Sequence, residues 1–495
     1  MIHDIIFGMA SAVDPLLDPF RPRFHFTPRF GWMNDPAGLV HHDGEWHLFY
    51  QHNPAQAAWG DIHWGHAVSR DLIRWTHLPP ALAPHPRLGQ VFTGSVVVDR
   101  DHSSGPCGGT SRLAALFTHA MGADDEQAQS LALSTDRGRS WSLHPDNPVI
   151  PNPGISDFRD PRVLWHDATR RWVMVLAAHD RARLYHSTDL VRWDHAGDVG
   201  PISGLPPGVW ECPDLFPLRV EGTGQRLWVF KLDLSRGQGH LGASRYLVGT
   251  FDGARFSAQG SAAGRPLDGG LDFFAAQSFS NAPAGERIWI GWLNNWQYAP
   301  VTPTGTWRGA MSIPRRLSLV RSGSDVLLAQ QPVDQLARLR RPLPLCLSDG
   351  VELADGATHR PLPGGVQTDS LELELELEPR GATVQLRLLQ TGRQYTTVGY
   401  DSLAGELFLD RTRAGDASFH RGFAVRRVMR HPLPPDGRLR LRLFVDRSTV
   451  EVFADDGRSV ISALVFPQGV GGGVQLVSSG GRATVRRLAA WSLDS

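Results

Sequence analysis

The chain has 495 residues with 50 Lys or Arg and 50 Asp or Glu, so its formal net charge at pH 7 is zero. The length predicts two domain cores, and the absence of a basic field argues against nucleic acid and membrane surfaces as partners. Its only cysteines, Cys107, Cys212 and Cys346, are too few and too widely spaced for a disulfide framework or a four-cysteine zinc site.

The N-terminus carries a short apolar stretch over residues 5–12. His3 and Asp4 precede it, where a signal peptide would have Lys or Arg. No later run approaches the roughly 18 apolar residues of a membrane helix. We therefore expect a soluble chain and favour a cytoplasmic location, with secretion as the alternative.

A repeated pattern then divides the N-terminal half. Segments that run from a Ser through an Asp-containing turn to a Trp begin at Ser69, Ser134 and Ser187, and a degenerate copy begins at Gly249. Each copy follows a short apolar segment, and the copies lie roughly 50 to 65 residues apart, as the blades of a β-propeller do. The alternative is that hairpins with Asp turns recur here by chance.

The pattern changes between about residues 321 and 345, where a more helical stretch rich in Arg and Leu ends near Pro342 and Pro344. We therefore predict a first domain over residues 20–325, a linker over 326–345 and a second domain over 346–495.

The C-terminal region alternates apolar and polar residues with a period of two. LELELELE begins at Leu371, RLRLRLFV at Arg438 and STVEVF at Ser448. Such strands should bury one face only. ADDGRS, which follows Phe453, contains the Asp-Gly signal of a tight hairpin. The second domain is therefore predicted to be an antiparallel β-sandwich, and the whole chain to be all-β.

Two aspartates lie in contexts unlike those of surface acids. Asp35, in GWMNDPAG, has the amide of Asn34 before it and Pro36 after it, which favours a rigid, shielded carboxyl or simply a turn. Asp160, in FRDPRV, follows Arg159, whose cation should hold the pKa of the carboxyl down; a structural ion pair is the alternative.

A third acid, Glu211, stands in VWECPDLF between Trp210 and Cys212. Apolar surroundings would raise its pKa and leave it a proton to donate, as a general acid requires. The alternative is that Asp214 is the important acid and Glu211 an edge-strand residue. A retaining glycosidase needs two such carboxyls, one to attack the anomeric carbon and one to protonate the leaving oxygen.

Six motifs occur in the order seen in glycoside hydrolase family 32: WMNDPAG, LFYQHNP, HWGHAVSRDL, FRDPRV, WECPDLF and WRGAMSIPR. The chain thus resembles the β-fructosidases of the levanase, exo-inulinase and invertase group from about Phe24 to Leu319. The resemblance continues more weakly through LRLFVDRSTVEVFADDGRSVIS. It implies a five-bladed β-propeller with an axial pocket, a C-terminal β-sandwich, no cofactor and no metal. It also implies fructan, fructooligosaccharide or sucrose as substrate for a monomer or homodimer.

The same resemblance assigns roles to residues. Asp35 would be the nucleophile, Glu211 the general acid and then base, and Asp160 the stabiliser of the transition state. Substrate contacts would come from Trp32, Asn34, Gln51, Trp59, Phe92, Thr93, Arg159, Asp272 and Trp296. Two positions depart from the family pattern: Ala37 replaces the usual Asn, which affects leaving-group preference, and Phe274 replaces a frequent Tyr.

Other functions are also compatible with parts of the pattern. The box from Ser134 to Trp141 also fits sialidase propellers, but none of the six tyrosines has an activating context. A fructan-binding propeller without activity would have lost an acid, and all three are present. A fructosyltransferase would share the chemistry up to the intermediate. His63 and His66 stand three apart, which on a strand sends them to opposite faces and argues against a metal site.

Overall fold

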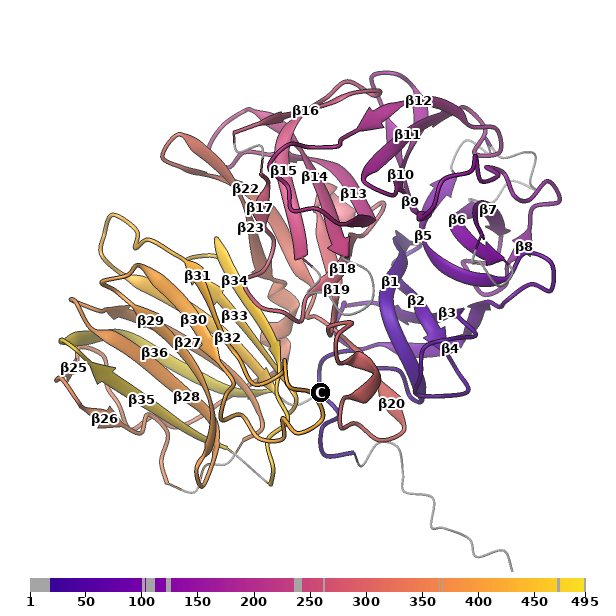
Figure 1. Cartoon of the computed structure of the whole chain (residues 1–495). Helices are drawn as coiled ribbons and strands as arrows, with labels where there is room; N and C mark the ends of the chain where they lie inside the picture. Colours follow the sequence, from indigo (N-terminus) through magenta and orange to yellow (C-terminus); the bar gives the residue numbers. More distant parts are fainter. Residues whose placement is uncertain are drawn as a thin grey trace, which may run out of the picture.

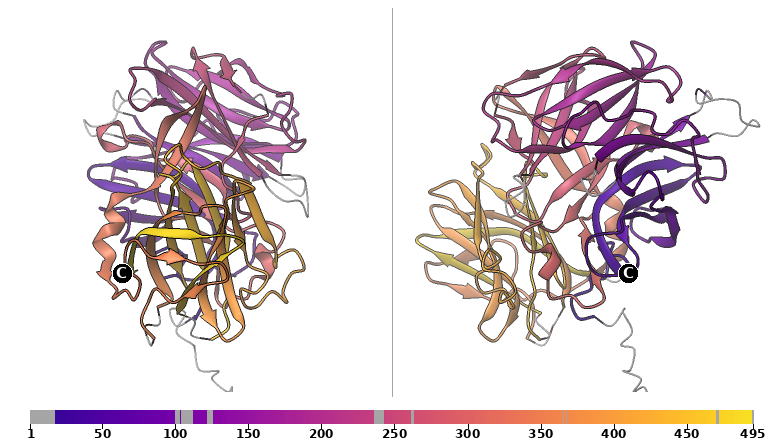
Figure 2. Two further views of the ribbon diagram at one scale, coloured as in Figure 1. Left: turned by 90° about the vertical axis from the view of Figure 1, so that its left-hand side faces the viewer. Right: turned by 45° about the vertical axis from the view of Figure 1, so that its right-hand side comes forward.

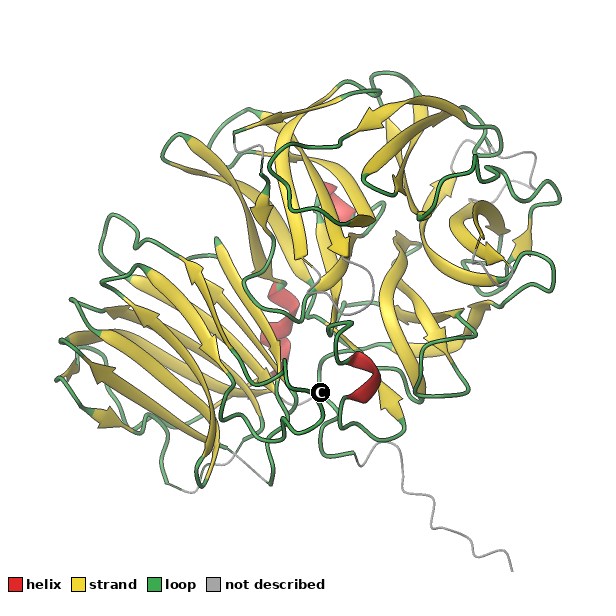
Figure 3. Ribbon diagram, in the orientation of Figure 1, coloured by secondary structure: helices red, strands yellow, loops and turns green. Residues whose placement is uncertain are grey.

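The computed structural model describes residues 18–99, 103, 112–121, 126–235, 243–260, 263–364, 366, 368–469 and 472–493. The apolar stretch over residues 5–12 and Cys107 lie outside these ranges. Almost all regular structure in this part of the chain is β-strand (Figure 3). No helix among the described residues is long and apolar enough to cross a membrane.

The first domain consists of five sheets that follow one another along the chain (Figure 1). The first contains β1 (Gly31–His42), β2 (Glu45–Asn53), β3 (His63–Ser69) and β4 (Thr76–Leu82), and the second β5 (Gln90–Asp99), β6 (Arg112–Met121), β7 (Glu126–Ser134) and β8 (Ser142–Leu143). The third contains β9 (Phe158–His166), β10 (Arg171–Ala178), β11 (Arg181–Ser187) and β12 (Asp194–Val199). The fourth contains β13 (Val209–Arg219), β14 (Arg226–Ser235), β15 (Ala243–Phe251), β16 (Phe256–Gln259) and β17 (Arg265–Pro266). The fifth contains β18 (Phe274–Ser278), β19 (Ile288–Leu293), β21 (Ala310–Met311), β22 (Arg315–Ser322) and β23 (Asp325–Pro332).

The first strand of each sheet lies at the centre of the domain. β1 contacts β5, β5 contacts β9, β9 contacts β13, β13 contacts β18, and β18 contacts β1, so that the five strands close a ring. The short β20 (Trp307–Arg308) comes between β19 and β21 in the chain but belongs to the first sheet, where it pairs in parallel with β1. This closed ring confirms the predicted five-bladed propeller.

The Asp-containing turns link the third and fourth strands of successive blades. In the first three blades, the indole N–H of the repeated Trp donates to a carbonyl three residues earlier, as from Trp75 to Leu72, from Trp141 to Gly138 and from Trp193 to Leu190. The repeated Asp accepts backbone N–H groups in each turn. The repeat therefore reflects one conserved way of closing a blade.

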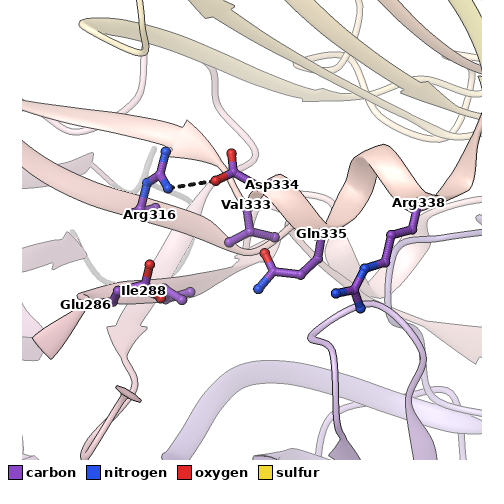
Figure 4. A pocket seen from close by; sticks show the side chains of 7 residues that line it. All are labelled: Glu286, Ile288, Arg316, Val333, Asp334, Gln335 and Arg338. Atoms are coloured by element: carbon purple, nitrogen blue, oxygen red, sulfur yellow. Dashed lines mark hydrogen bonds and ion pairs between the residues drawn. The ribbon is translucent and has the colours of Figure 1, made fainter. Parts of the chain in front are cut away.

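The predicted helical linker is largely wrong. Residues 325–332 form β23, which pairs with β22 along its whole length and completes the fifth blade. Only the 3-10 helix η4 (Asp334–Leu339) follows. Two further 3-10 turns, η2 (Pro283–Gly285) and η3 (Ala299–Val301), lie within the fifth blade. Figure 4 shows the hollow beside η4, where Arg316 binds Asp334. We propose that the first domain ends at Pro332.

Two sheets form the second domain, as the alternating strands predicted. One contains β24 (Arg340–Pro342), β25 (Glu352–Leu353), β27 (Ser370–Glu378), β32 (Leu439–Asp446), β33 (Thr449–Ala454), β34 (Ser459–Leu464) and β36 (Ala483–Leu493). The other contains β26 (Thr358–His359), β28 (Thr383–Thr391), β29 (Gln394–Asp401), β30 (Glu406–Asp410), β31 (Arg426–Arg430) and β35 (Gly473–Ser479). Their facing leucines and valines form one core.

The sandwich packs against the propeller (Figure 2), and β33 and β34 are among the strands that supply side chains to this contact. For β33, the expectation that only one face is buried is wrong, because every residue of this strand is buried. One face joins the sandwich core, and the other presents Phe453 to propeller side chains. Glu451, also on this outer face, forms ion pairs with Arg315 of the propeller and His25 of the N-terminal segment.

Candidate active site

The five central strands are irregular at the same end. Each loses its register with the next strand over a short interval: residues 33–36 in β1, 91–94 in β5, 159–162 in β9, 211–214 in β13 and 274–277 in β18. A bulge turns side chains away from the regular alternation of a strand. Prolines at 36, 161 and 213, which have no N–H for the ladder, lie in three of these intervals. The intervals contain Asp35, Thr93, Asp160 and Cys212, which the bulges direct toward the axis.

Asp35 is buried and is held by neighbouring polar groups. Its Oδ1 accepts a hydrogen bond from Asn34 at 3.1 Å, and its Oδ2 accepts from Thr93 at 3.0 Å and from Gln51 at 3.3 Å. The Gln51 amide also donates to Thr93. Three of the predicted substrate-binding residues thus contact the predicted nucleophile directly and fix its carboxylate.

Asp160 lies on the other side of Cys212. The backbone N–H of Cys212 donates to Asp160 Oδ2 at 2.8 Å, and the Cys212 thiol lies 3.6 Å from this oxygen and 3.4 Å from Asp35 Oδ2. Both residues have positive φ, 65° for Asp160 and 45° for Cys212. The strained backbone of the two bulges therefore brings two carboxylates to one sulfur atom.

Glu211 does not lie in the apolar surroundings expected from Trp210 and Cys212. Its Oε1 accepts a hydrogen bond from Arg159 Nη2 at 2.8 Å and one from the Ser235 hydroxyl at 2.8 Å. The side chain is 15% exposed, so solvent reaches it. The expectation failed because side chains alternate in direction along β13, so the sequence neighbours of Glu211 do not surround its carboxylate.

Burial and mutual repulsion raise the pKa values of the two aspartates. Burial raises the pKa of Asp35 to about 7, and the charges of Asp160 and Glu211 add to this shift. Burial also raises the pKa of Asp160 to about 6 despite the opposing cation of Arg159. The prediction that Arg159 holds the Asp160 pKa down is therefore wrong, since desolvation outweighs an ion pair whose nearest atoms are 3.9 Å apart.

The alternative acid, Asp214, has a structural partner. It is fully buried, its Oδ1 lies 2.9 Å from Arg162 Nε, and its Oδ2 accepts the backbone N–H of Ser278 at 2.7 Å. An acid neutralised in this way is not available to donate a proton to a substrate. The geometry therefore favours Glu211 over Asp214.

Aromatic side chains lie beside the acids. Trp32 is fully buried, donates from its indole to Asn34, and stacks on Trp296 with ring centroids 5.9 Å apart. Trp296 in turn packs against a buried cluster that contains Phe274 and Cys212. On another side, Trp59 is 43% exposed and its ring centroid lies 6.1 Å from that of Phe92, the residue before Thr93. These rings offer flat apolar faces next to the carboxylates.

Among the predicted substrate-binding residues, Asp272 lies away from the cluster of acids. It is fully buried, and its oxygen atoms bind Tyr298, Arg411 and the backbone N–H of Leu464. Two of these partners belong to the sandwich. We therefore correct the expectation that Asp272 faces the pocket mouth: its carboxylate belongs to the interface between the domains.

Several site residues were missed from the sequence. The thiol of Cys212 contacts both aspartates, Ser235 binds Glu211, Asp157 binds Arg159 at 2.6 Å, and Thr118 accepts the N–H of Asp160 at 3.0 Å. Cys212 could have been found from its place between Glu211 and Pro213. Nothing in the sequence around Ser235 or Thr118 distinguishes them from other strand residues.

Family models match nearly the whole chain. The model for the N-terminal domain of glycosyl hydrolases family 32 matches residues 25–332, and the model for the C-terminal domain of the same family matches residues 348–492. The first of these ranges includes every acid and aromatic residue described for the site.

Several curated relatives and solved structures are similar over most of their length. A levanase of Bacillus subtilis is 41% identical over 481 residues, which cover 95% of this chain and 70% of the levanase. An extracellular exo-inulinase of Aspergillus awamori is 36% identical, covering 95% of both chains. A crystal structure of exo-inulinase from the same fungus superimposes with a TM-score of 0.89 at 33% identity, covering 96% of this chain and 99% of the other. The β-fructofuranosidase of Schwanniomyces occidentalis, complexed with fructosyl-erythritol, gives 0.86 at 26% identity, covering 98% and 99%.

Proposed function

Since the chain belongs to glycosyl hydrolase family 32, we propose that it is a β-fructosidase that releases terminal fructose from fructans, fructooligosaccharides or sucrose. One observation carries the assignment of its active site: three carboxyls from three different blades meet around Cys212 and Arg159. A cluster with one cation for three acids is costly to maintain unless the acids have chemistry to perform.

Asp35 is the proposed nucleophile. Three side-chain donors fix its carboxylate, and it is only 6% exposed, so attack on C2 of fructose requires little reorganisation. The attack forms a covalent fructosyl-enzyme bond while the bond to the leaving oxygen breaks. Asp160, beside it, would accept fructose hydroxyls and stabilise positive charge that develops on the sugar ring.

Glu211 is the proposed acid and base. Both donors that reach it from the described residues bind Oε1, which leaves Oε2 to carry the proton for the departing oxygen. Glu211 then takes a proton from water, which hydrolyses the intermediate with retention of configuration. This mechanism requires the two carboxyl groups to lie about 5 to 5.5 Å apart.

Product analysis tests the function. The full chain is incubated briefly with sucrose, levan or inulin, and the products are separated by chromatography. Terminal attack gives free fructose as the first product, and from sucrose equal amounts of glucose and fructose. Mixed oligosaccharides from the polymers would refute terminal attack. An excess of glucose over fructose would assign transfer rather than hydrolysis, and no release from any of the three would refute the function.

A further inference from the structure

A buried group of three side chains joins the two domains next to the site. Asp272 and Tyr298 come from the propeller and are fully buried, and Arg411, 2% exposed, follows β30 of the sandwich. The Tyr298 hydroxyl and Arg411 Nη1 each bind one oxygen of Asp272, and Arg411 Nη2 donates to the Tyr298 hydroxyl at 2.8 Å. Each member therefore binds the other two.

The sandwich holds Arg411 firmly on its own side. Its Nε donates to the carbonyl of Phe423 at 2.5 Å, and Nη1 donates to the carbonyl of Leu464 at 3.0 Å. The guanidinium also lies 4.0 Å from the centroid of the Phe423 ring. A planar group with these fixed contacts has one orientation, so it can position whatever it binds.

On the propeller side, Asp272 and Tyr298 belong to two short segments that also carry Phe274 and Trp296. We call these two aromatic residues the wall. Asp272 precedes Phe274 by two residues, and Tyr298 follows Trp296 by two residues. The Asn295 amide ties the two segments together by donating to the carbonyl of Leu271 at 2.8 Å. Arg411 therefore binds both segments that supply the wall.

The wall continues to the nucleophile through direct contacts. Trp296 stacks on Trp32, the indole of Trp32 donates to Asn34, and Asn34 donates to Asp35. We propose that Arg411 is a positioning residue through which the sandwich sets the place of Trp296 and Phe274, and thereby the binding of the sugar next to the scissile bond. This inference depends on the β-fructosidase function proposed above.

The competing explanation is that Arg411 only stabilises the interface. His25 provides a matched comparison, since it is also buried at this interface and binds Asp446 at 2.9 Å and Glu451 at 2.8 Å. Burial lowers the pKa of His25, but the two carboxylates outweigh burial and raise it to about 9, so the ring is charged near neutral pH. Its contacts among the described residues are with Phe24 and with β32 and β33, not with the segments that carry the wall.

The experiment compares Arg411→Lys, Tyr298→Phe and His25→Gln in the full chain. KM and kcat for fructose release from sucrose and from a short inulin oligosaccharide are measured beside the melting temperature. Arg411→Lys keeps the charge, but its three donors on one nitrogen cannot replace the four hydrogen bonds of the guanidinium. We expect it to raise KM about tenfold or more while kcat changes less than about threefold, because misplaced wall residues weaken binding. Tyr298→Phe should shift KM in the same direction by a smaller factor, and His25→Gln should lower the melting temperature with KM within about twofold.

The inference is overturned if Arg411→Lys lowers the melting temperature and leaves KM unchanged, or if His25→Gln raises KM as much. If Arg411→Lys does not fold, Tyr298→Phe decides alone, and an unchanged KM then counts against the inference. Failure of the wild-type chain to release fructose would instead refute the proposed function itself.

Discussion

Acidic side chains gather in two parts of the molecule and are neutralised to different degrees. On one face of the sandwich, Glu372 binds Arg340 and Arg442, and Glu374 binds Arg340, with N to O distances of 2.6 to 2.8 Å. Around the propeller axis, Arg159 pairs with Glu211 at 2.8 Å and lies 3.9 Å from Asp160, and within the described residues no ion pair reaches Asp35.

The degree of neutralisation differs because the backbone directs the acidic side chains in different ways in the two regions. On the sandwich, strict alternation places the Glu side chains of β27 on one face, opposite the Arg side chains of β32. At the axis, bulges bring acids from separate blades together without matching cations. A formal net charge of zero for the chain therefore hides a local excess of negative charge, and this excess marks the functional end of the propeller.

Removing a carboxyl from the axis should have the largest effect. Asp35→Ala is expected to lower kcat for fructose release by about 10⁴-fold or more, because the covalent intermediate cannot form. The circular dichroism spectrum should stay like that of the wild type, which would show that the variant is folded. Glu374→Ala on the sandwich is the matched control, with kcat/KM within about twofold of the wild type. Near-normal turnover by Asp35→Ala would remove Asp35 from its role.

The loss in Glu211→Ala should depend on the leaving group. On sucrose or inulin, kcat is expected to fall by about 10² to 10⁴-fold, because the departing oxygen leaves without a proton. On an aryl fructoside whose leaving group needs no proton, the initial burst of phenol should be much less affected. Equal losses on both kinds of substrate would contradict the assignment of Glu211 as the acid.

The excess of negative charge at the axis should also lower the free energy of unfolding at pH values where Asp35 is ionised. The pKa of Asp35 is about 7 in the folded protein, against an ordinary value of 3.8. The folded state therefore holds the proton more tightly, and the stabilisation from this carboxyl is complete below pH 4 and is lost as the pH rises through 7. Asp35→Asn cannot ionise, so it should exceed the wild type in free energy of unfolding by about 2 to 4 kcal/mol at pH 8.

Urea unfolding of both proteins at pH 8 and pH 4 measures this difference. The advantage of Asp35→Asn should largely disappear at pH 4, where the wild-type carboxyl is protonated in the folded state and about half protonated in the unfolded state. An Asn variant that is less stable than the wild type at pH 8 would show that the carboxylate at the axis is not a destabilising charge.

The sequence predicts the architecture because periodic features determine it. The Ser-x-Asp turns that end in Trp75, Trp141 and Trp193 mark the blades, and the alternation in β27 and β32 marks the sandwich. Periodicity gave wrong predictions at two strands. The sequence of β23 resembles a helical segment, and the outer face of β33 is covered by the propeller. Burial by a distant part of the chain leaves no local pattern.

The family motifs name Asp35, Asp160 and Glu211, and the structure brings Asp35 and Asp160 to Cys212 and Glu211 to Arg159, although the local chemistry expected for Asp160 and Glu211 was wrong. The direction of the pKa shift at Asp160 was missed, because the shift depends on burial and on acids more than 50 residues away in sequence. The position of Asp272 was missed for a similar reason: its partner Arg411 lies 139 residues later, in the other domain.

The smallest effect is expected on the sandwich face. Glu374→Gln removes one charge from a partly exposed set, in which Arg340 retains its two hydrogen bonds to Glu372. The free energy of unfolding should fall by about 0 to 1 kcal/mol, and the difference from the wild type should shrink further in 1 M NaCl, since salt screens exposed charges. Urea unfolding at low and high salt measures both values. The contrary result would be a loss of stability in Glu374→Gln as large as the gain in Asp35→Asn at pH 8. The excess of negative charge would then no longer distinguish the acids at the propeller axis from those on the sandwich.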